Sequence, residues 1–202
     1  LIAEQGIYPE TFSPPKRTSL KQTTKPIGGF TPRDFGQSKS PPGFSPRSQH
    51  ETGCAKIHCD FDANTVCNYL TGRGRVKMSL PAKSTLRSWR LSDRQVANSL
   101  TGIFTDVSGD GMFAYAGLTD DRTDMFFLSS SEFRTHQKTK LLFNYHLAGI
   151  EGRLRVCIDD LRLCPFEMLG KNIKPSSRSW QQGSILLERG IYTVGFTKNH
   201  GW

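Results

Sequence analysis

The sequence predicts an all-β protein, an antiparallel jelly-roll β-sandwich preceded by a disordered tail. Beyond residue 53, short runs of residues alternate apolar with polar side chains, and this period of two is typical of strands with one buried face. No segment keeps a helical spacing of apolar residues over a dozen positions. The connections are also too short for the helical crossovers that parallel strands need. Two packed layers of antiparallel strands are the architecture that buries such faces.

The first 52 residues have a composition of their own. Eight of the 11 prolines and seven of the 27 Lys and Arg residues fall within the first 50 positions. Proline lacks the amide donor and fixes φ, and the apolar residues between the prolines follow neither period 2 nor period 3.6. We therefore expect residues 1–52 to be a disordered, basic, Pro-rich linker without a packed element, and residues 53–202 to form one domain.

Seven runs after the linker are predicted to be strands. The clearest alternation covers 141–147, 153–159 and 192–197, and the shorter runs are 86–91, 112–117, 125–129 and 184–187. Glycine and aspartate at 110–111 and glycine at 149 and 152 supply turn chemistry between them. The alternation places Trp89, Phe143 and Tyr145 in the core and His146 on the polar, exposed face.

Four of the five cysteines are predicted to form two local disulfides. Six residues separate Cys157 from Cys164, which lets the chain reverse and bring the two cysteines opposite each other. Cys59 and Cys67 enclose seven residues and are paired likewise. Each loop closure contributes about 2.5 kcal/mol in the chain-entropy treatment. Disulfides are typical of an oxidising compartment, so the protein is expected to be extracellular.

Cys54 has no partner in this scheme, which leaves a free thiol, an interchain bridge or a partner elsewhere. A zinc site made of Cys54, His58, Cys59 and Cys67 is the alternative. The spacing of these residues matches no usual zinc finger.

The order of several short motifs resembles the MAM domain, named for meprin, neuropilin and receptor tyrosine phosphatase mu. The first half contains Cys59-Asp60-Phe61-Asp62, Cys67, Trp89-Arg90, Thr101-Gly102, Asp106 and Gly111-Met112-Phe113-Ala114-Tyr115. The second half contains residues 142–149, residues 152–156, Trp180 and residues 190–196. The resemblance covers residues 59–202. It implies a jelly-roll β-sandwich of extracellular proteins, which mediates adhesion or oligomerisation and not catalysis.

The sequence departs from the MAM pattern in two places. Lys140-Leu141 stands where the family usually has a cysteine before a strand, which puts the family's second disulfide in doubt. The chain stops at Trp202, where family members continue into a last strand. We therefore expect a C-terminally incomplete domain with an exposed sheet edge.

Four acidic residues are candidate calcium ligands. Asp60 and Asp62 are two positions apart on an expected strand and so face the same way, and Asp106 and Asp110 flank a Ser-Gly turn. Carboxylate and backbone oxygens are the ligands that Ca²⁺ prefers. The resemblance implies a cation near these positions, because some MAM domains bind one there. The alternative is that all four are solvated acids and that the protein has no cofactor.

Several functional classes lack support in the sequence. It contains no nucleophile elbow, zinc-protease motif or phosphate-binding loop, so we expect no enzyme activity from this chain; a glycan hydrolase is the version to test. A catalytic domain elsewhere in a parent protein remains open. No apolar run is long enough to insert into a membrane. Charge after residue 53 is mixed, which disfavours a nucleic-acid partner.

The expected function is an extracellular, non-catalytic protein-interaction module of a larger secreted or membrane-anchored protein. Its partner would be a protein, with a second copy of the chain as one option. The alternative is a lectin-like module that binds glycans by stacking on Trp89, Trp180 or Trp202, although the core interpretation is favoured for Trp89. Arg153 and Arg155, outward on one strand, form either a basic contact patch or a solvated face.

Overall fold

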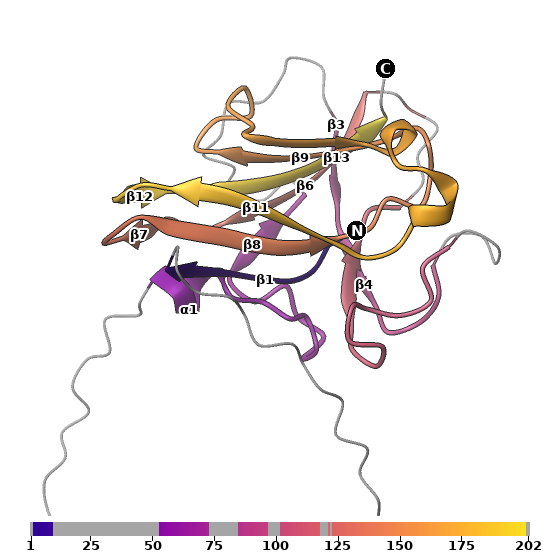
Figure 1. Cartoon of the computed structure of the whole chain (residues 1–202), viewed down its shortest axis with the longest axis horizontal. Helices are drawn as coiled ribbons and strands as arrows, with labels where there is room; N and C mark the ends of the chain where they lie inside the picture. Colours follow the sequence, from indigo (N-terminus) through magenta and orange to yellow (C-terminus); the bar gives the residue numbers. More distant parts are fainter. Residues whose placement is uncertain are drawn as a thin grey trace, which may run out of the picture.

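The computed structural model of the protein (Figure 1) describes residues 2–9, 53–72, 85–96, 102–117, 121 and 123–200. Its strands are β1 (Ile2–Pro9), β2 (Tyr69–Thr71), β3 (Thr85–Ser88), β4 (Arg90–Ser92), β5 (Phe113–Tyr115), β6 (Asp124–Ser130), β7 (Phe133–Thr135), β8 (Thr139–Tyr145), β9 (Gly152–Ile158), β10 (Phe166–Leu169), β11 (Gln181–Leu187), β12 (Gly190–Tyr192) and β13 (Val194–His200). The helical elements are short: α1 (Gly53–Ile57), η1 (Gly170–Asn172) and η2 (Pro175–Ser177). The all-β prediction is confirmed.

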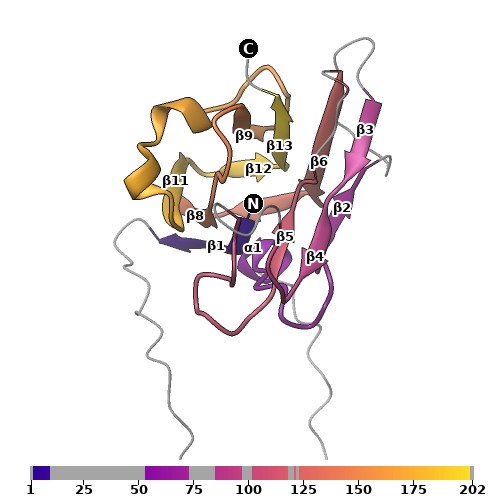
Figure 2. The same cartoon turned by 90° about the vertical axis from the view of Figure 1, so that its right-hand side faces the viewer.

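The strands form two main sheets that pack face to face. One sheet has the order β11-β8-β1-β5-β4, and the other has the order β10-β9-β13-β6-β2 with β3 added beside β6. Figures 1 and 2 show the two layers from perpendicular directions, with β8 and β1 in one layer and β9 and β13 in the other. Strands β7 and β12 form a separate two-stranded ladder. Among the described residues, every strand pair but one is antiparallel, the exception being β3 with β6.

Aromatic rings fill the space between the layers. Phe143 on β8 is 1% exposed, and its ring centroid lies 5.6 Å from that of Phe196 on β13 and 4.9 Å from that of Phe166 on β10. Both ring pairs are edge to face, the arrangement that the charge distribution of the rings favours. Trp89 and Tyr145 are also buried. The three predicted core residues, Trp89, Phe143 and Tyr145, are therefore confirmed.

Each of the seven predicted runs contains a strand, but run 86–91 is two strands. Strand β3 pairs with β6 in one layer, and β4 pairs with β5 in the other. Trp89 lies between them, buried, and its backbone N–H donates to Thr71 Oγ1 at 2.7 Å. The chain therefore crosses from one layer to the other at Trp89.

The prediction that residues 1–52 contain no packed element is wrong for Ile2–Pro9. These residues form β1, which pairs with β8 from Ile2 opposite Tyr145 to Pro9 opposite Thr139 and meets β5 at Ala114. The register of β1 shifts between Ala3 and Gln5. Such a bulge breaks the two-residue period, which explains why the pattern did not reveal the strand. The rest of the expected linker, residues 10–52, lies outside the described residues.

Both predicted disulfides are confirmed. Cys59 is bonded to Cys67, and Cys157 is bonded to Cys164. The second bridge closes the turn between β9 and β10, which Asp159 also holds by accepting the Thr193 N–H at 2.6 Å. Because Cys59 and Cys67 are bonded to each other, they are not available as the thiolate ligands of the zinc alternative. Cys54 lies in α1.

Candidate functional site

The loop from Ile103 to Met112, here called the Phe104 loop, leads into β5 and exposes two apolar side chains. Phe104 is 57% exposed and Val107 is 42% exposed. At the base of the loop Ile103 is buried and exchanges two backbone hydrogen bonds with Val96, of 3.0 and 3.1 Å. The loop is therefore anchored by one apolar residue while it presents two others to solvent.

Asp106 braces the Phe104 loop from within. Its side chain is buried; Oδ1 accepts hydrogen bonds from the backbone N–H of Gly109 at 2.7 Å and of Gly111 at 3.0 Å. The Ser108 hydroxyl donates to Oδ2 at 2.6 Å. Burial alone would raise the pKa of Asp106, but these hydrogen bonds outweigh it and hold the pKa below its usual value. Asp106 is therefore ionised at neutral pH, and its carboxylate links its own position to Gly109 and Gly111 of the same loop.

A second carboxylate reaches the loop from a distant part of the chain. Asp62 Oδ1 accepts the backbone N–H of Met112 at 2.9 Å. A Cβ added to Gly111 would lie 2.5 Å from Asp62 Oδ1 and 2.7 Å from Asp106 Oδ2. A side chain at position 111 would therefore push the two carboxylates away from their present positions, because both converge there.

The structure brings the four predicted calcium ligands together in two pairs. Asp60 Oδ1 accepts the Asp62 backbone N–H at 3.1 Å, and the Ser108 hydroxyl, which lies beside Asp106, is also 3.1 Å from Asp110 Oδ1. Asp60 and Asp62 do not lie on a strand as expected. The buried Phe61 between them has a φ of 68°, so the chain turns at this position.

The two converging carboxylates supply only part of a calcium site. Ca²⁺ takes six to eight oxygen ligands, and Asp62 and Asp106 each already accept backbone N–H groups. Among the described residues, no group of three or more His, Cys, Asp or Glu side chains is arranged to hold a metal ion. The geometry accounts for Asp62 and Asp106 as braces of the loop, and calcium binding stays a prediction.

Trp180 also contacts the Phe104 loop. Its Nε1 donates to the Thr105 carbonyl at 2.8 Å, and its ring lies edge to face with Phe113 at 5.9 Å and with His146 at 5.7 Å. Trp180 and Thr105 are 75 positions apart in the sequence, so no local pattern predicts their contact. Trp180 is thus engaged by the protein itself, and Trp202 lies outside the described residues.

His146 is buried, with 7% exposure, so the prediction that it lies on the surface is wrong. Strand β8 ends at Tyr145, and the alternation of faces does not continue to position 146. Burial, with the nearby positive charge of Arg178, lowers the pKa of His146 to about 4. His146 is therefore neutral at pH 7.

Acidification is expected to destabilise the protein through His146. The folded-state pKa is depressed, so between pH 6.5 and about 4 the unfolded chain binds the proton that the folded chain excludes. The free energy of unfolding should fall by roughly 2 kcal/mol over this window, a value reduced for partial solvation. Urea unfolding at pH 7 and pH 4.5 measures it. His146→Gln should lose this part of the pH dependence, and equal pH dependence in both proteins would contradict the prediction.

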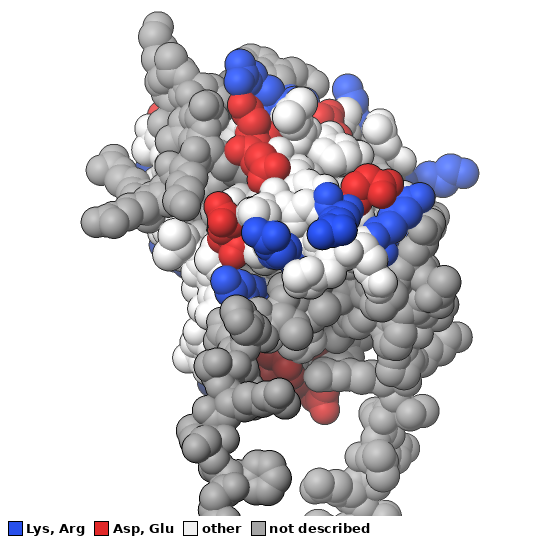
Figure 3. Space-filling model, turned by 90° about the vertical axis from the view of Figure 1, so that its left-hand side faces the viewer, with Lys and Arg blue, Asp and Glu red and all other residues white. Residues whose placement is uncertain are grey.

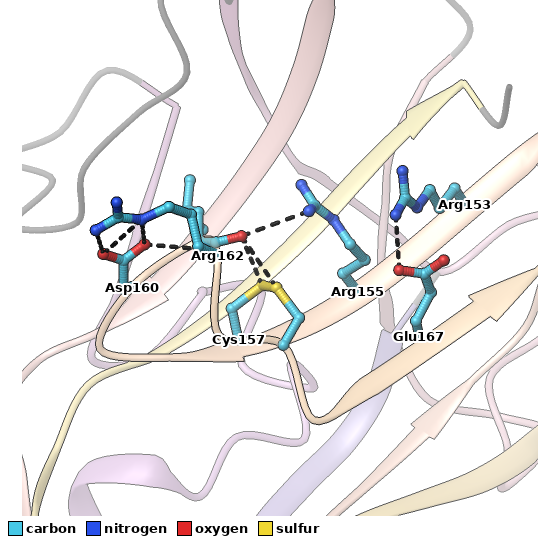
Figure 4. The surroundings of a disulfide bond; sticks show 8 residues. Arg153, Arg155, Cys157, Asp160, Arg162 and Glu167 are labelled. Carbon is cyan, nitrogen blue, oxygen red and sulfur yellow. Dashed lines mark hydrogen bonds and ion pairs between the residues drawn. A yellow bond between two sulfur atoms is a disulfide. The ribbon is translucent and has the colours of Figure 1, made fainter.

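The two arginines of β9 are held by neighbouring residues (Figure 4). Arg153 forms an ion pair with Glu167 of β10 at 2.7 Å, and Arg155 Nη1 lies 3.4 Å from the carbonyl oxygen of Leu161. Beside the disulfide, Arg162 pairs with Asp160 at 2.6 Å. On the face drawn in Figure 3, acidic and basic side chains are interspersed. Arg153 and Arg155 are thus used in part within the β9–β10 hairpin.

Comparison of the chain with protein-family models, with curated proteins and with solved structures finds no match. Within the described residues, no helix has the length and apolar character needed to cross a bilayer. Asp62 and Asp106 are among the residues that the sequence pattern marks, whereas Phe104 and Val107 are not, because the loop has no regular period to show which side chains face outward.

Proposed function

We propose that this chain is a MAM-like extracellular, non-catalytic protein-interaction module of a larger secreted or membrane-anchored protein, with the Phe104 loop as a contact surface. The observation that carries the proposal is the exposure of Phe104 and Val107 on a loop braced by Asp106, Asp62 and Trp180. A loop that is already ordered loses little conformational entropy when it binds. Aromatic anchors are also enriched among the residues that dominate interface energies.

The extracellular assignment rests on the two disulfides. Cytosolic thiols are kept reduced, whereas disulfides persist in secreted proteins and ectodomains. Both bridges close short loops of the sandwich and involve the buried residues Cys59 and Cys157. An oxidising environment therefore suits the fold, and secretion or display on a cell surface provides one.

The partner that we propose is a protein, and specifically a second copy of this chain. Sedimentation velocity over a range of concentrations should show reversible self-association of the wild-type protein. Phe104→Ser should weaken it by about tenfold or more, because it removes an exposed aromatic anchor. Ile150→Ser is the matched control, since Ile150 is 64% exposed in a different loop. A wild-type protein that stays monomeric, or equal weakening by both variants, would refute the proposal.

A lectin-like module is the alternative function. Trp89 is buried, and Trp180 uses its Nε1 and ring edges within the protein, which leaves Phe104 as an exposed aromatic ring for stacking on a sugar. Because Trp180 contacts the neighbouring Thr105, its fluorescence should report on any ligand of the loop. Quenching by soluble glycans would favour the lectin function; we expect the emission to stay unchanged.

Calcium binding is tested separately by isothermal titration. If Asp62 and Asp106 hold Ca²⁺, the wild-type protein should give saturable heat that Asp62→Ala abolishes. Asp93→Ala is the control, because Asp93 is an exposed acid whose ion-pair partner is Arg94 at 3.8 Å. No heat at millimolar Ca²⁺ would contradict calcium binding and leave the carboxylates with the bracing role described above.

A further inference from the structure

Strand β1 lies inside a sheet although it is far along the chain from its neighbours. It sits between β8 and β5 in the five-stranded sheet, and the next described element, α1, begins at Gly53. Figures 1 and 2 show β1 alongside β8 in the lower layer. In the part of the chain that the structure describes, β8 and β5 each pair with β1 and not with each other. Strand β1 thus fills a slot in the sheet.

The backbone supplies the contacts that hold β1 in this slot. Seven residues of β1 have register partners on β8, and Ile2 also has one on β5. When an extended segment joins a sheet, main-chain hydrogen bonds provide much of the affinity. The hydrogen bonds depend on an extended backbone, and a second copy of the chain carries the same β1 sequence. The slot would therefore accept the same segment from another molecule.

The connection between β1 and α1 is long enough to permit this exchange. Residues 10–52 make 43 positions and contain seven prolines. At polyproline spacing, 43 residues can reach up to about 130 Å. The effective concentration of a tethered segment falls as its tether lengthens. A second copy can therefore compete with the chain's own β1.

We propose that β1 is exchanged between two copies, so that β1 of one copy pairs with β8 and β5 of the other. The pairing within the slot is the same whether β1 comes from its own chain or from a partner, so tether length and protein concentration set the balance. The inference rests on the proposed function in one respect, namely that the partner is a second copy. It adds a contact that does not involve Phe104.

Cysteine cross-linking of the full chain tests the exchange. Tyr8 and Lys140 are register partners across β1 and β8, and directly opposed positions are close enough for a disulfide. One tagged chain carries Tyr8→Cys and a differently tagged chain carries Lys140→Cys, both with Cys54→Ser so that Cys54 cannot form a competing disulfide. Coexpression and oxidation should give a dimer that contains both tags. Arg87→Cys on β3, in the other sheet, replaces Lys140→Cys in the control.

The outcome for a single chain carrying both Tyr8→Cys and Lys140→Cys completes the test. Two results together would overturn the exchange. The doubly substituted chain would form its new disulfide entirely within one molecule, and the separate variants would give no more mixed dimer than the Arg87→Cys control. Sedimentation then separates the two proposals. If the exchange fails but the wild-type protein still dimerises and the Phe104→Ser variant does not, the proposed function survives without the exchange. If the mixed dimer forms but Phe104→Ser has no effect, the exchange survives and the Phe104 contact is wrong.

Discussion

Replacing Phe143 with alanine is expected to lower the free energy of unfolding by about 4 kcal/mol. Phe143 is 1% exposed and contacts Phe166 and Phe196 edge to face, so its removal opens a cavity between the two sheets. The adjacent position on β11 is Gly183, where an added Cβ would collide with the Phe143 ring. The backbone is therefore already close on that side, and the cavity can collapse only in part.

Urea unfolding monitored by circular dichroism measures the loss at Phe143. Leu163→Ala is the control, because it removes an apolar side chain that is 64% exposed and should change stability by less than about 0.5 kcal/mol. A loss below about 1 kcal/mol for Phe143→Ala would show that the two sheets do not pack through this ring.

Removing the Cys157–Cys164 disulfide is expected to cost about 2.5 kcal/mol through the unfolded chain, and more through lost packing. Cys157 is buried in a small apolar cluster with Met125, Phe127 and Leu161, apart from the main core. The bridge holds the β9–β10 turn against this cluster. Cys157→Ala with Cys164→Ala should therefore destabilise the protein beyond the loop-closure value.

The other disulfide provides the comparison. Cys59→Ala with Cys67→Ala opens a loop of nearly the same length, so its entropic cost is also about 2.5 kcal/mol. Cys59, like Cys157, is buried, but its partner Cys67 is exposed, whereas Cys164 packs in part against the cluster that contains Phe127. We expect the loss at Cys157–Cys164 to be the larger in paired urea unfolding curves. Equal losses would contradict an extra contribution from packing at the Cys157–Cys164 bridge.

Among the strands that the sequence predicts, β11 shows the expected alternation of buried and exposed side chains most clearly, whereas every residue of β6 is buried. Ile185 and Leu187 of β11 are buried, whereas Leu186 between them is exposed. Strands β2, β7 and β10 lie outside the predicted runs, and each spans only three or four residues. Strand β1 is hidden by its register shift. Local disulfides were predictable because the short loops between the cysteines constrain where the thiols can lie.

The candidate site was predictable only in part. Asp106 stands in a stretch rich in Ser, Gly and Asp, where a turn is expected and a carboxylate commonly accepts hydrogen bonds from the backbone. The other supports of the loop come from Asp62 and Trp180, which are distant in sequence. Burial of His146 depends on where β8 ends and on Trp180 packing beside it. Such contacts follow from the tertiary fold and not from local spacing.

The crossing of the chain at Trp89 is expected to couple the unfolding of the two sheets. Strands β3 and β4 are separated by this single buried residue, yet they belong to different layers. Opening either layer by itself would have to pull Trp89 out of the space between them. Backbone amides of β6 and β5, the partners of β3 and β4, should therefore exchange hydrogen for deuterium through the same global opening event.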